Sequence, residues 1–287
     1  MQEVLVCPIC NNDKLKETLR VQDHFASQEN FKLYKCSPCE LLLTSPVPDE
    51  NQIVTYYKSN SYVSHGDSVN PLFDSTYKFI QGRNLKYKRK IIEKYTLGKN
   101  ILDYGCGAGS FLQYMTRYGW TGFGIEPDTS AKQIAINKGI NITDLQNLNT
   151  KYDCISLFHV LEHVHQLEST LQKLIEHLDR NGIIVLALPN FKSADATNYQ
   201  EFWAGYDVPR HLYHFSQKSI FNLSKKIGLN IVSTHPLYFD SYYVSLLSEK
   251  YKTGKSNLLK AMYQGYKSNS KATKTKEYSS LIYILSK

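Results

Sequence analysis

Residues 101–110 read Ile101-Leu102-Asp103-Tyr104-Gly105-Cys106-Gly107-Ala108-Gly109-Ser110, and this stretch decides the fold of the chain. Its apolar start predicts a buried strand, the alternate glycines predict a tight turn, and a helix follows. Because glycine has no Cβ, the backbone N–H groups of such a turn can meet a ligand at the positive end of the helix. A dinucleotide-binding turn has its third glycine where Ser110 stands, which counts against NAD.

A second short strand, residues 122–125, ends in an acidic residue. Glu126 follows this strand, and a carboxylate at that place can accept hydrogen bonds from both hydroxyls of a ribose. This order predicts one βαβ half of a nucleoside-binding sheet: a strand, the glycine turn, a helix, and a second strand with an acidic end. The candidate cofactor-binding residues from this half are Asp103, Gly105, Gly107, Gly109 and Glu126.

Two later blocks, residues 152–164 and 182–190, complete a pattern with residues 101–109 and 124–128. Together the four blocks resemble the class I S-adenosylmethionine-dependent methyltransferases, over residues 95–240. The resemblance implies S-adenosylmethionine as cofactor and an α/β fold, with a doubly wound, mostly parallel seven-stranded sheet. It also places Asp144 where family members often bind the adenine amino group, although a turn or capping role is the alternative.

Strands and helices alternate along the rest of the chain, which implies parallel strands with right-handed crossovers. The last strand, residues 278–285, is antiparallel in the resembling fold. We expect residues 46–97 to form a linker or lid and a leading helix, and residues 98–287 to form the methyltransferase domain. A basic helical insertion is expected at about residues 238–277. Its apolar stripe could cap a lipophilic or lipid-linked substrate, but core packing is the more common role of such a stripe.

Residues 1–45 carry two C-x-x-C pairs, Cys7 with Cys10 and Cys36 with Cys39. Two such pairs can close a tetrahedral Zn²⁺ site, so we expect a structural zinc ribbon, with two disulfides or free thiols as the alternative. The segment resembles the zinc-ribbon leaders of some bacterial methyltransferases. It departs from them at Glu40, where those knuckles have glycine and the backbone often needs a positive φ.

The first group of candidate catalytic residues is His159, Glu162 and His163, directly after the fourth strand. His159 and His163 are predicted to lie one helical turn apart on the same face. The block resembles that of quinone O-methyltransferases, in which acidic residues and a histidine can hold a divalent cation, but His159 replaces an acidic residue. Lining of the cofactor pocket, packing or capping, and a role as base or metal ligand all stay open.

The second group lies in the loop at residues 203–215, which joins Asp207, Arg210, His211 and His214 to aromatic residues. Long loops at strand ends often carry function. His211 or His214 is a candidate general base, and Arg210 a candidate anchor for an anionic group of the substrate. The alternative is that Arg210 and Asp207 merely tie the loop down.

The 287 residues suit one large α/β domain with a small appendage, and the net charge is +8. The excess charge is concentrated in residues 250–287, which contain nine lysines, no arginine and one acidic residue. No apolar run approaches the roughly 18 residues of a membrane span. No signal-peptide pattern is visible at the N-terminus, so we expect a cytoplasmic protein.

These observations predict transfer of a methyl group from S-adenosylmethionine to oxygen or carbon of a small molecule, such as a lipophilic quinone-like or sugar-linked intermediate. An RNA methyltransferase is the first alternative, but the lysine cluster lacks arginine and the interleaved stacking pattern expected of an RNA-binding segment. A non-catalytic binding module that kept the fold is the second.

Overall fold

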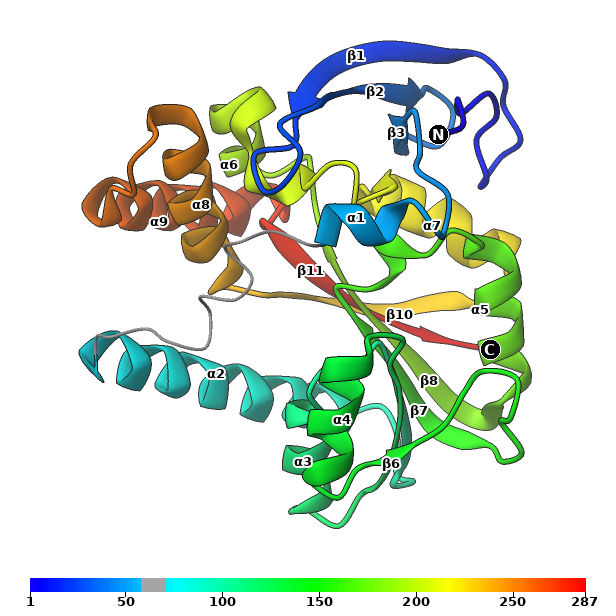
Figure 1. The fold of residues 1–287 in the computed structure, drawn as a ribbon. Helices are drawn as coiled ribbons and strands as arrows, with labels where there is room; N and C mark the ends of the chain where they lie inside the picture. The colour runs from blue at the N-terminus through cyan, green and yellow to red at the C-terminus, as the bar shows by residue number, and fades with distance from the viewer. Residues whose placement is uncertain (58–70) are drawn as a thin grey trace.

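The structure is a computed structural model that describes residues 1–57 and 71–287, with side chains for 1–57 and 80–287. Residues 58–70 of the predicted linker therefore lie outside the described residues. Within the described chain, seven strands form one sheet in the order β10-β11-β8-β7-β4-β5-β6 (Figure 1). Their bounds are β4 Asn100–Tyr104, β5 Thr121–Ile125, β6 Asn141–Ile142, β7 Tyr152–Phe158, β8 Leu178–Pro189, β10 Asn230–Pro236 and β11 Ser280–Ser286.

The central strands of the sheet are parallel, and β11 pairs antiparallel with both β8 and β10. The chain starts in the middle at β4, runs outward to β6, and then returns across β7 to the other half. This order confirms the predicted doubly wound, mostly parallel seven-stranded sheet. The carboxyl ends of β4 and β7 are neighbours, so the residues that follow these two strands meet at one edge.

Helices cover both faces of the sheet. Successive apolar side chains of β8 point alternately to the two faces. Ile183, Val185 and Ala187 pack on one face with residues of α2 (Pro71–Ile92), α3 (Ser110–Thr116) and α4 (Thr129–Asn137). Ile184, Leu186 and Leu188 pack on the other with α5 (Leu167–Glu176) and α7 (Gln217–Lys226). A strand that is apolar on both faces is what burial between two helix layers requires.

The N-terminal segment forms a second sheet, in the order β1-β2-β3-β9, at the top of Figure 1. β1 (Leu15–Gln22), β2 (Asn30–Cys36) and β3 (Leu42–Ser45) come from residues 1–45, but β9 (Tyr213–His214) comes from the loop at 203–215. Leu42 pairs with His214 and Leu43 with Tyr213. The N-terminal segment is therefore joined by a strand to the loop that carries candidate catalytic residues.

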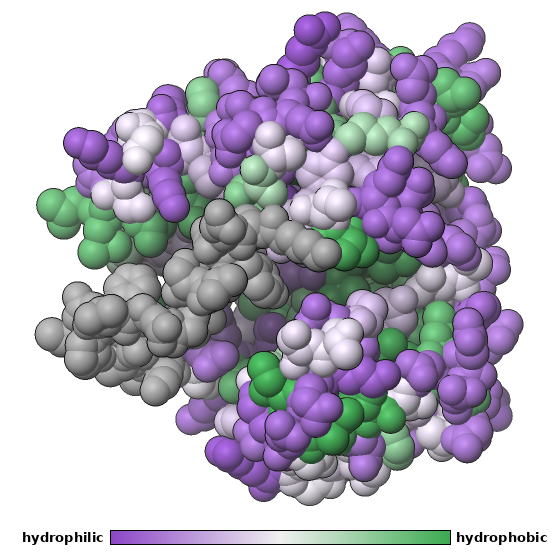
Figure 2. Space-filling view, in the orientation of Figure 1, coloured by the Kyte–Doolittle hydropathy of each residue, from purple (hydrophilic) through white to green (hydrophobic). Residues whose placement is uncertain are grey.

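Short helices connect the two parts. α1 (Ile53–Tyr57) follows the N-terminal sheet, and α6 (Ala194–Tyr199) follows β8. Between β10 and β11 the chain forms a helical hairpin of α8 (Asp240–Thr253) and α9 (Leu258–Thr275), within the range expected for the basic insertion. Apolar side chains gather on the surface over α9, at the left of Figure 2. No helix in the described residues is both long and apolar enough to cross a bilayer.

Candidate functional site

The glycine turn after β4 has the conformation that its sequence requires. Gly105, Gly107 and Gly109 all have positive φ, at 76°, 53° and 71°. A Cβ on Gly105 would lie 2.4 Å from Cγ2 of Val160, so the turn packs directly against the segment that follows β7. A Cβ on Gly107 would meet nothing within 4 Å, so open space lies beside this part of the turn. A turn with a bare backbone beside open space fits a bound cofactor.

Two carboxylates flank this turn. Asp103 is buried at the end of β4 and accepts a hydrogen bond of 2.6 Å from the Ser156 hydroxyl. Burial raises the pKa of Asp103 to about 7, against the opposing effects of that hydrogen bond and of the nearby Lys88 ammonium. Glu126 accepts the Gly107 N–H at 2.8 Å and the Asp128 N–H at 2.9 Å, so it supports the backbone of the turn.

Asp144 lies apart from these carboxylates, beyond β6. Its side chain is 62% exposed and lies 3.7 Å from the Lys132 ammonium. Its suggested contact with adenine and the suggested contact of Glu126 with ribose both stay predictions.

The segment after β7 brings together the first group of candidate residues. The prediction that His159 and His163 share one face of a helix is wrong, because His159 has φ 57° and the helical turn spans Leu161–His163. Instead, the His159 ring lies 3.1 Å from Asp240 at the start of α8 and 3.6 Å from Glu162. Partial burial opposes protonation, but these two carboxylates raise the pKa of His159 to about 9.

Glu162 is the most unusual residue of this group, because it is 1% exposed and neither side-chain oxygen has a hydrogen-bond partner among the described residues. Burial disfavours its charged form, yet His159 and the charges of His211 and His163 hold its pKa below the usual value. A buried carboxylate that accepts no hydrogen bond is costly unless a bound group or a proton uses it.

His163 and His211 lie beside Glu162, with ring centroids 4.6 Å apart. His163 Nδ1 lies 3.0 Å from the Arg210 carbonyl, and His211 Nδ1 lies 3.0 Å from the Gly205 carbonyl. A carbonyl oxygen only accepts, so each Nδ1 carries a proton, and Nε2 is bare whenever the ring is neutral. One ligand atom each from Glu162, His163 and His211 lies within 4.8 Å of the others. We call these three residues the histidine–glutamate cluster.

His214 faces another direction. The Thr44 hydroxyl donates to the His211 carbonyl at 2.6 Å, so it accepts from His214 Nε2 at 3.0 Å. Burial and the charge of His211 lower the pKa of His214 well below its usual value. This ring fastens β9 to β3 through Nε2, while its buried Nδ1 has no hydrogen-bond partner among the described residues, so its role as a base stays a prediction.

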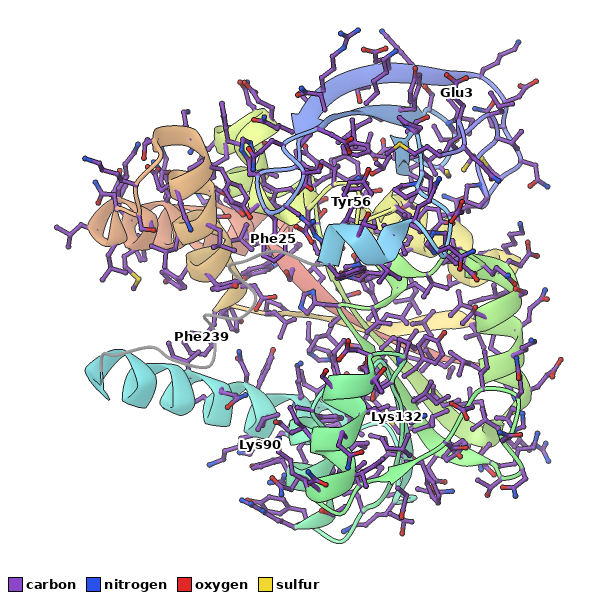
Figure 3. All side chains as sticks on the ribbon, in the orientation of Figure 1. Glu3, Phe25, Tyr56, Lys90, Lys132 and Phe239 are labelled. Carbon is purple, nitrogen blue, oxygen red and sulfur yellow. The ribbon has the colours of Figure 1, made fainter. Side chains whose placement is uncertain are left out.

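Arg210 is held by the protein in the same way. Its guanidinium contacts both oxygens of Asp207, Asp23 at 3.1 Å and the Tyr56 carbonyl at 2.8 Å. It also lies 4.5 Å from the centre of the Phe25 ring; Phe25 and Tyr56 are labelled in Figure 3 below the N-terminal sheet. These bonds use four of its five N–H donors, so the geometry favours the alternative in which Arg210 ties the loop down.

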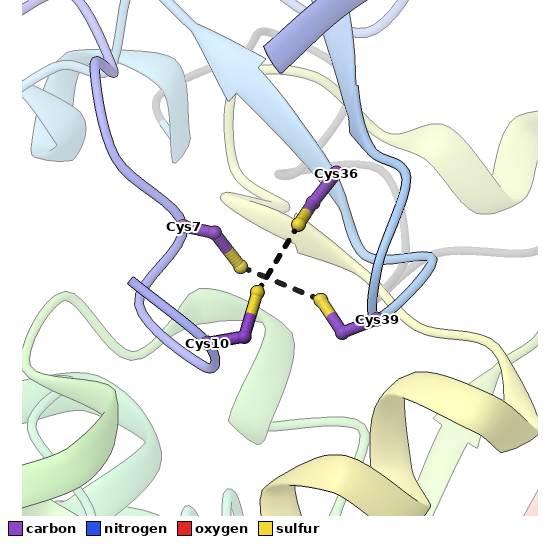
Figure 4. A group of neighbouring side chains, drawn as sticks. All are labelled: Cys7, Cys10, Cys36 and Cys39. Atoms are coloured by element: carbon purple, nitrogen blue, oxygen red, sulfur yellow. Dashed lines mark hydrogen bonds between the residues drawn. The ribbon is translucent and has the colours of Figure 1, made fainter. Parts of the chain in front are cut away.

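The four N-terminal cysteines converge (Figure 4). The Sγ atoms of Cys7 and Cys39 are 3.5 Å apart, those of Cys10 and Cys36 are 3.3 Å apart, and all four lie within 4.8 Å. Zn–S bonds of 2.3 Å in a tetrahedron place sulfurs about 3.8 Å apart, so the thiols fit a metal ion. Asn11 and Glu40, directly after the second cysteine of each pair, have φ of 57° and 61°, as the sequence indicated for Glu40.

Two neighbours of the site carry no sequence signal. Lys88 of α2 lies 3.8 Å from the centre of the Phe158 ring at the end of β7, and its charge acts on Asp103 and Asp240. Asp240 pairs with His159 across the sheet edge. In the sequence, Lys88 is one of several lysines of a basic helix and Asp240 is an isolated acid.

Comparison with known proteins assigns the chain to a family. The sequence model of a methyltransferase domain family matches residues 78–234, more than half of the chain. An uncharacterized methyltransferase of Bacillus cereus is 30% identical over 152 residues, which cover 46% of this chain and 72% of the relative.

Two further relatives are named ubiquinone biosynthesis O-methyltransferases. The one from Rickettsia canadensis is 27% identical over 173 residues, covering 52% of this chain and 73% of the relative. The mitochondrial one from Schizosaccharomyces pombe is 31% identical, but the match covers 31% of this chain and 38% of the relative.

Among solved structures, magnesium protoporphyrin IX methyltransferase from Synechocystis shares the fold. Its structure with bound SAH has a TM-score of 0.52 and 16% identity, and the match covers 83% of this chain and 99% of that chain. The family match and the Bacillus relative together show that this chain belongs to the methyltransferase domain family and is an S-adenosylmethionine-dependent methyltransferase, as its motifs predicted.

Proposed function

We propose that the protein methylates a hydroxyl oxygen of a small, lipophilic, quinone-like molecule, with His211 as the general base. Relatives with the name ubiquinone biosynthesis O-methyltransferase support this acceptor class. The observation that carries the proposal is the buried Glu162 carboxylate, 4.0 Å from His211 Nε2 and without a hydrogen bond among the described residues. A phenolic hydroxyl must lose its proton on methylation, and this cluster is suited to take it.

The glycine turn and its flanking carboxylates are the proposed cofactor site. S-adenosylmethionine, when bound, supplies an electrophilic methyl group on a sulfonium. Gly107 presents its backbone beside open space, between Gly105 and Gly109, which pack against Val160 and Ile140, and Asp103 offers a carboxyl group at the strand end. Glu126 and Asp144 are the proposed contacts for ribose and adenine, and His159 is proposed to line the pocket next to Asp240.

His211 suits the task of a base for geometric reasons. Its Nδ1–H is fixed on the Gly205 carbonyl, which orients the ring and leaves Nε2 to accept a proton. Glu162 and Asp207 lie 4.0 and 3.9 Å from Nε2, where their charges stabilise the imidazolium that forms. Arg210 and His214, the other candidates of this loop, are proposed to position it.

Calorimetry with S-adenosylmethionine tests the proposed cofactor, since a folded protein that does not bind it refutes the assignment.

Labelled methyl transfer to a catechol with a short prenyl tail tests the proposed acceptor and base. His211→Gln is expected to lower turnover by about 10²–10⁴-fold, the usual contribution of a general base, with cofactor affinity unchanged. His177→Gln, which removes a ring bonded to Thr150 at the other end of β7, is the control and should keep full turnover. Equal turnover in the two variants would exclude His211 as the base.

The same cluster supports a second mechanism, in which Glu162, His163 and His211 hold a divalent cation. Both rings donate Nδ1–H to carbonyls, which is how metal-binding histidines are usually oriented. A cation there would polarise the acceptor oxygen and help it to lose its proton. Turnover that depends on added Mg²⁺, and that no longer responds to Mg²⁺ in Glu162→Gln, would favour the cation over the base.

We further propose that the four N-terminal cysteines hold a structural Zn²⁺. Their sulfur distances fit a tetrahedral ion, and four protein ligands leave no position open for chemistry. Metal analysis of the purified protein should find about one equivalent of zinc, and Cys10→Ala should lose it. Absence of tightly held zinc in folded protein would refute this site.

A further inference from the structure

α9 exposes an unusual row of large apolar side chains. They are Leu258, Leu259, Met262, Tyr263 and Tyr266, with 56%, 84%, 48%, 60% and 64% of their surface exposed. Their spacing places them along one side of the helix. The alternative that the predicted stripe is core packing is therefore wrong for α9, although Leu246 and Leu247 of α8 are half-buried.

A different side of α9 attaches the helix to the protein. Ala261, Gly265, Ser268 and Ala272 are its buried residues. Gly265 approaches Tyr242 of α8 so closely that a Cβ there would lie 2.6 Å from the ring, and the Ser268 hydroxyl donates to Asp195 of α6 at 2.5 Å. The small residues of α9 therefore pack against the protein, and the large apolar residues are not needed for this packing.

The charge beside the apolar row has one sign. Residues 240–276 contain eight lysines, all exposed, and two acidic residues, Asp240 and Glu249. Glu249 is 1% exposed and pairs with Lys260, while Asp240 pairs with His159. No other lysine of the hairpin lies within 4.0 Å of an acidic oxygen in the described chain. Lys267, Lys271 and Lys274 follow the side of α9 next to the apolar row.

We propose that the α8–α9 hairpin is a peripheral membrane-binding surface that docks on anionic lipid. Exposed leucine, methionine and tyrosine beside a lysine band are the pattern of a helix that lies in the headgroup region. The lysines supply attraction to acidic headgroups, and the apolar row supplies insertion below them. Figure 2 shows this apolar surface at the left edge of the molecule.

Nucleic acid is the other anionic partner that a lysine band could attract, and the hairpin fits it less well. Lysines bind phosphates of either partner, and Tyr263 and Tyr266 offer rings on which a base could stack, but Leu258, Leu259 and Met262 offer none. Leu259, with 84% of its surface exposed, is the most exposed apolar side chain of the hairpin, and a lipid surface uses it together with its aliphatic neighbours.

Co-sedimentation of the zinc-loaded full-length protein with vesicles tests the proposal. Binding is expected to mixed phosphatidylcholine–phosphatidylglycerol vesicles and not to pure phosphatidylcholine vesicles, and it should weaken in high salt. Leu259→Glu should weaken it about tenfold, because a half-immersed leucine is replaced by a charge that the lipid repels. Lys267→Gln should weaken it about fivefold, the usual effect of one lysine near an anionic surface.

Leu97→Glu is the matched control, because Leu97 is fully exposed, at 101%, and lies outside the hairpin. It should bind vesicles as the unaltered protein does. Equal binding to neutral and anionic vesicles, or equal loss in Leu97→Glu and Leu259→Glu, would overturn the proposal. Binding to poly-uridylate without binding to either vesicle would overturn it in favour of nucleic acid.

Discussion

At the scale of single residues, Glu40 has a left-handed backbone conformation, which glycine adopts most easily. It has φ 61° directly after Cys39, and its side chain pairs with Lys192 at 3.2 Å. Glu40→Gly and Glu40→Ala both remove the ion pair, so their difference isolates the backbone. We expect the glycine variant to be more stable by about 1 kcal/mol, since alanine keeps the Cβ that disfavours positive φ. Urea unfolding of both zinc-loaded variants measures this, and equal stabilities would contradict it.

Asp103 makes folding depend on pH. Its pKa of about 7 in the folded protein is above the value of about 3.9 for an unfolded aspartate, because burial favours the neutral acid. This contribution to stability is complete below pH 4 and is lost as the pH rises through 7. Asp103→Asn removes this titrating group. Between pH 4 and 8, the free energy of unfolding of the protein with Asp103 should therefore fall by up to about 4 kcal/mol relative to that of the variant.

Urea unfolding of the two proteins between pH 4 and 8 measures that difference and cancels the other titrating groups they share. A difference in unfolding free energy that stays constant with pH would show that Asp103 ionises normally in the folded protein.

At the scale of elements, local patterns were enough for the strands and most helices of the sheet domain. β7 and β8 are apolar runs in the sequence because helices cover them on both faces, and Ser216 is a serine at the place where α7 needs an N-cap. β9 could not be predicted, since a two-residue strand has no period and its partner β3 is distant in sequence. The predicted helix at 159–163 failed because β7 ends in a left-handed residue, His159.

The cap of α7 supports a quantitative prediction. Ser216 Oγ accepts the Ser219 N–H at 3.1 Å, and Ser219 Oγ accepts the Ser216 N–H at 2.8 Å. Ser216→Ala should lower the free energy of unfolding by about 1–2 kcal/mol, as for other buried N-caps. Ser270→Ala, an exposed serine inside α9, should change it by less than about 0.5 kcal/mol in the same thermal unfolding experiment. Equal effects of the two changes would refute the capping role.

At the scale of the whole molecule, the sequence indicated local motifs better than the contacts between distant residues. The cysteine pairs and the glycine turn are local patterns, and each kept its predicted form. The histidine–glutamate cluster needs the loop at 203–215 to return to the end of β7, and Arg210 meets Asp23 across 187 residues. The spacing of residues along the sequence contains no information on contacts between distant segments. The result is an N-terminal segment that is tied to the methyltransferase part by β9 and by Arg210, rather than a separate appendage.

This connection predicts that the two parts unfold together and that Arg210 holds them. Arg210→Met leaves Asp23 buried, at 0% side-chain exposure, without its guanidinium partner. Loss of one partner of a buried ion pair costs about 3–5 kcal/mol, so the variant should unfold at clearly lower denaturant. Arg20→Met removes an exposed pair with Glu17 in the same sheet and should leave the midpoint nearly unchanged.

Trp203 lies near the junction and Trp120 in the sheet domain, so Trp120→Phe leaves one tryptophan, whose fluorescence reports on the junction. Its transition should coincide with loss of helical circular dichroism, because a shared sheet couples the parts; an earlier Trp203 transition would show that they unfold separately.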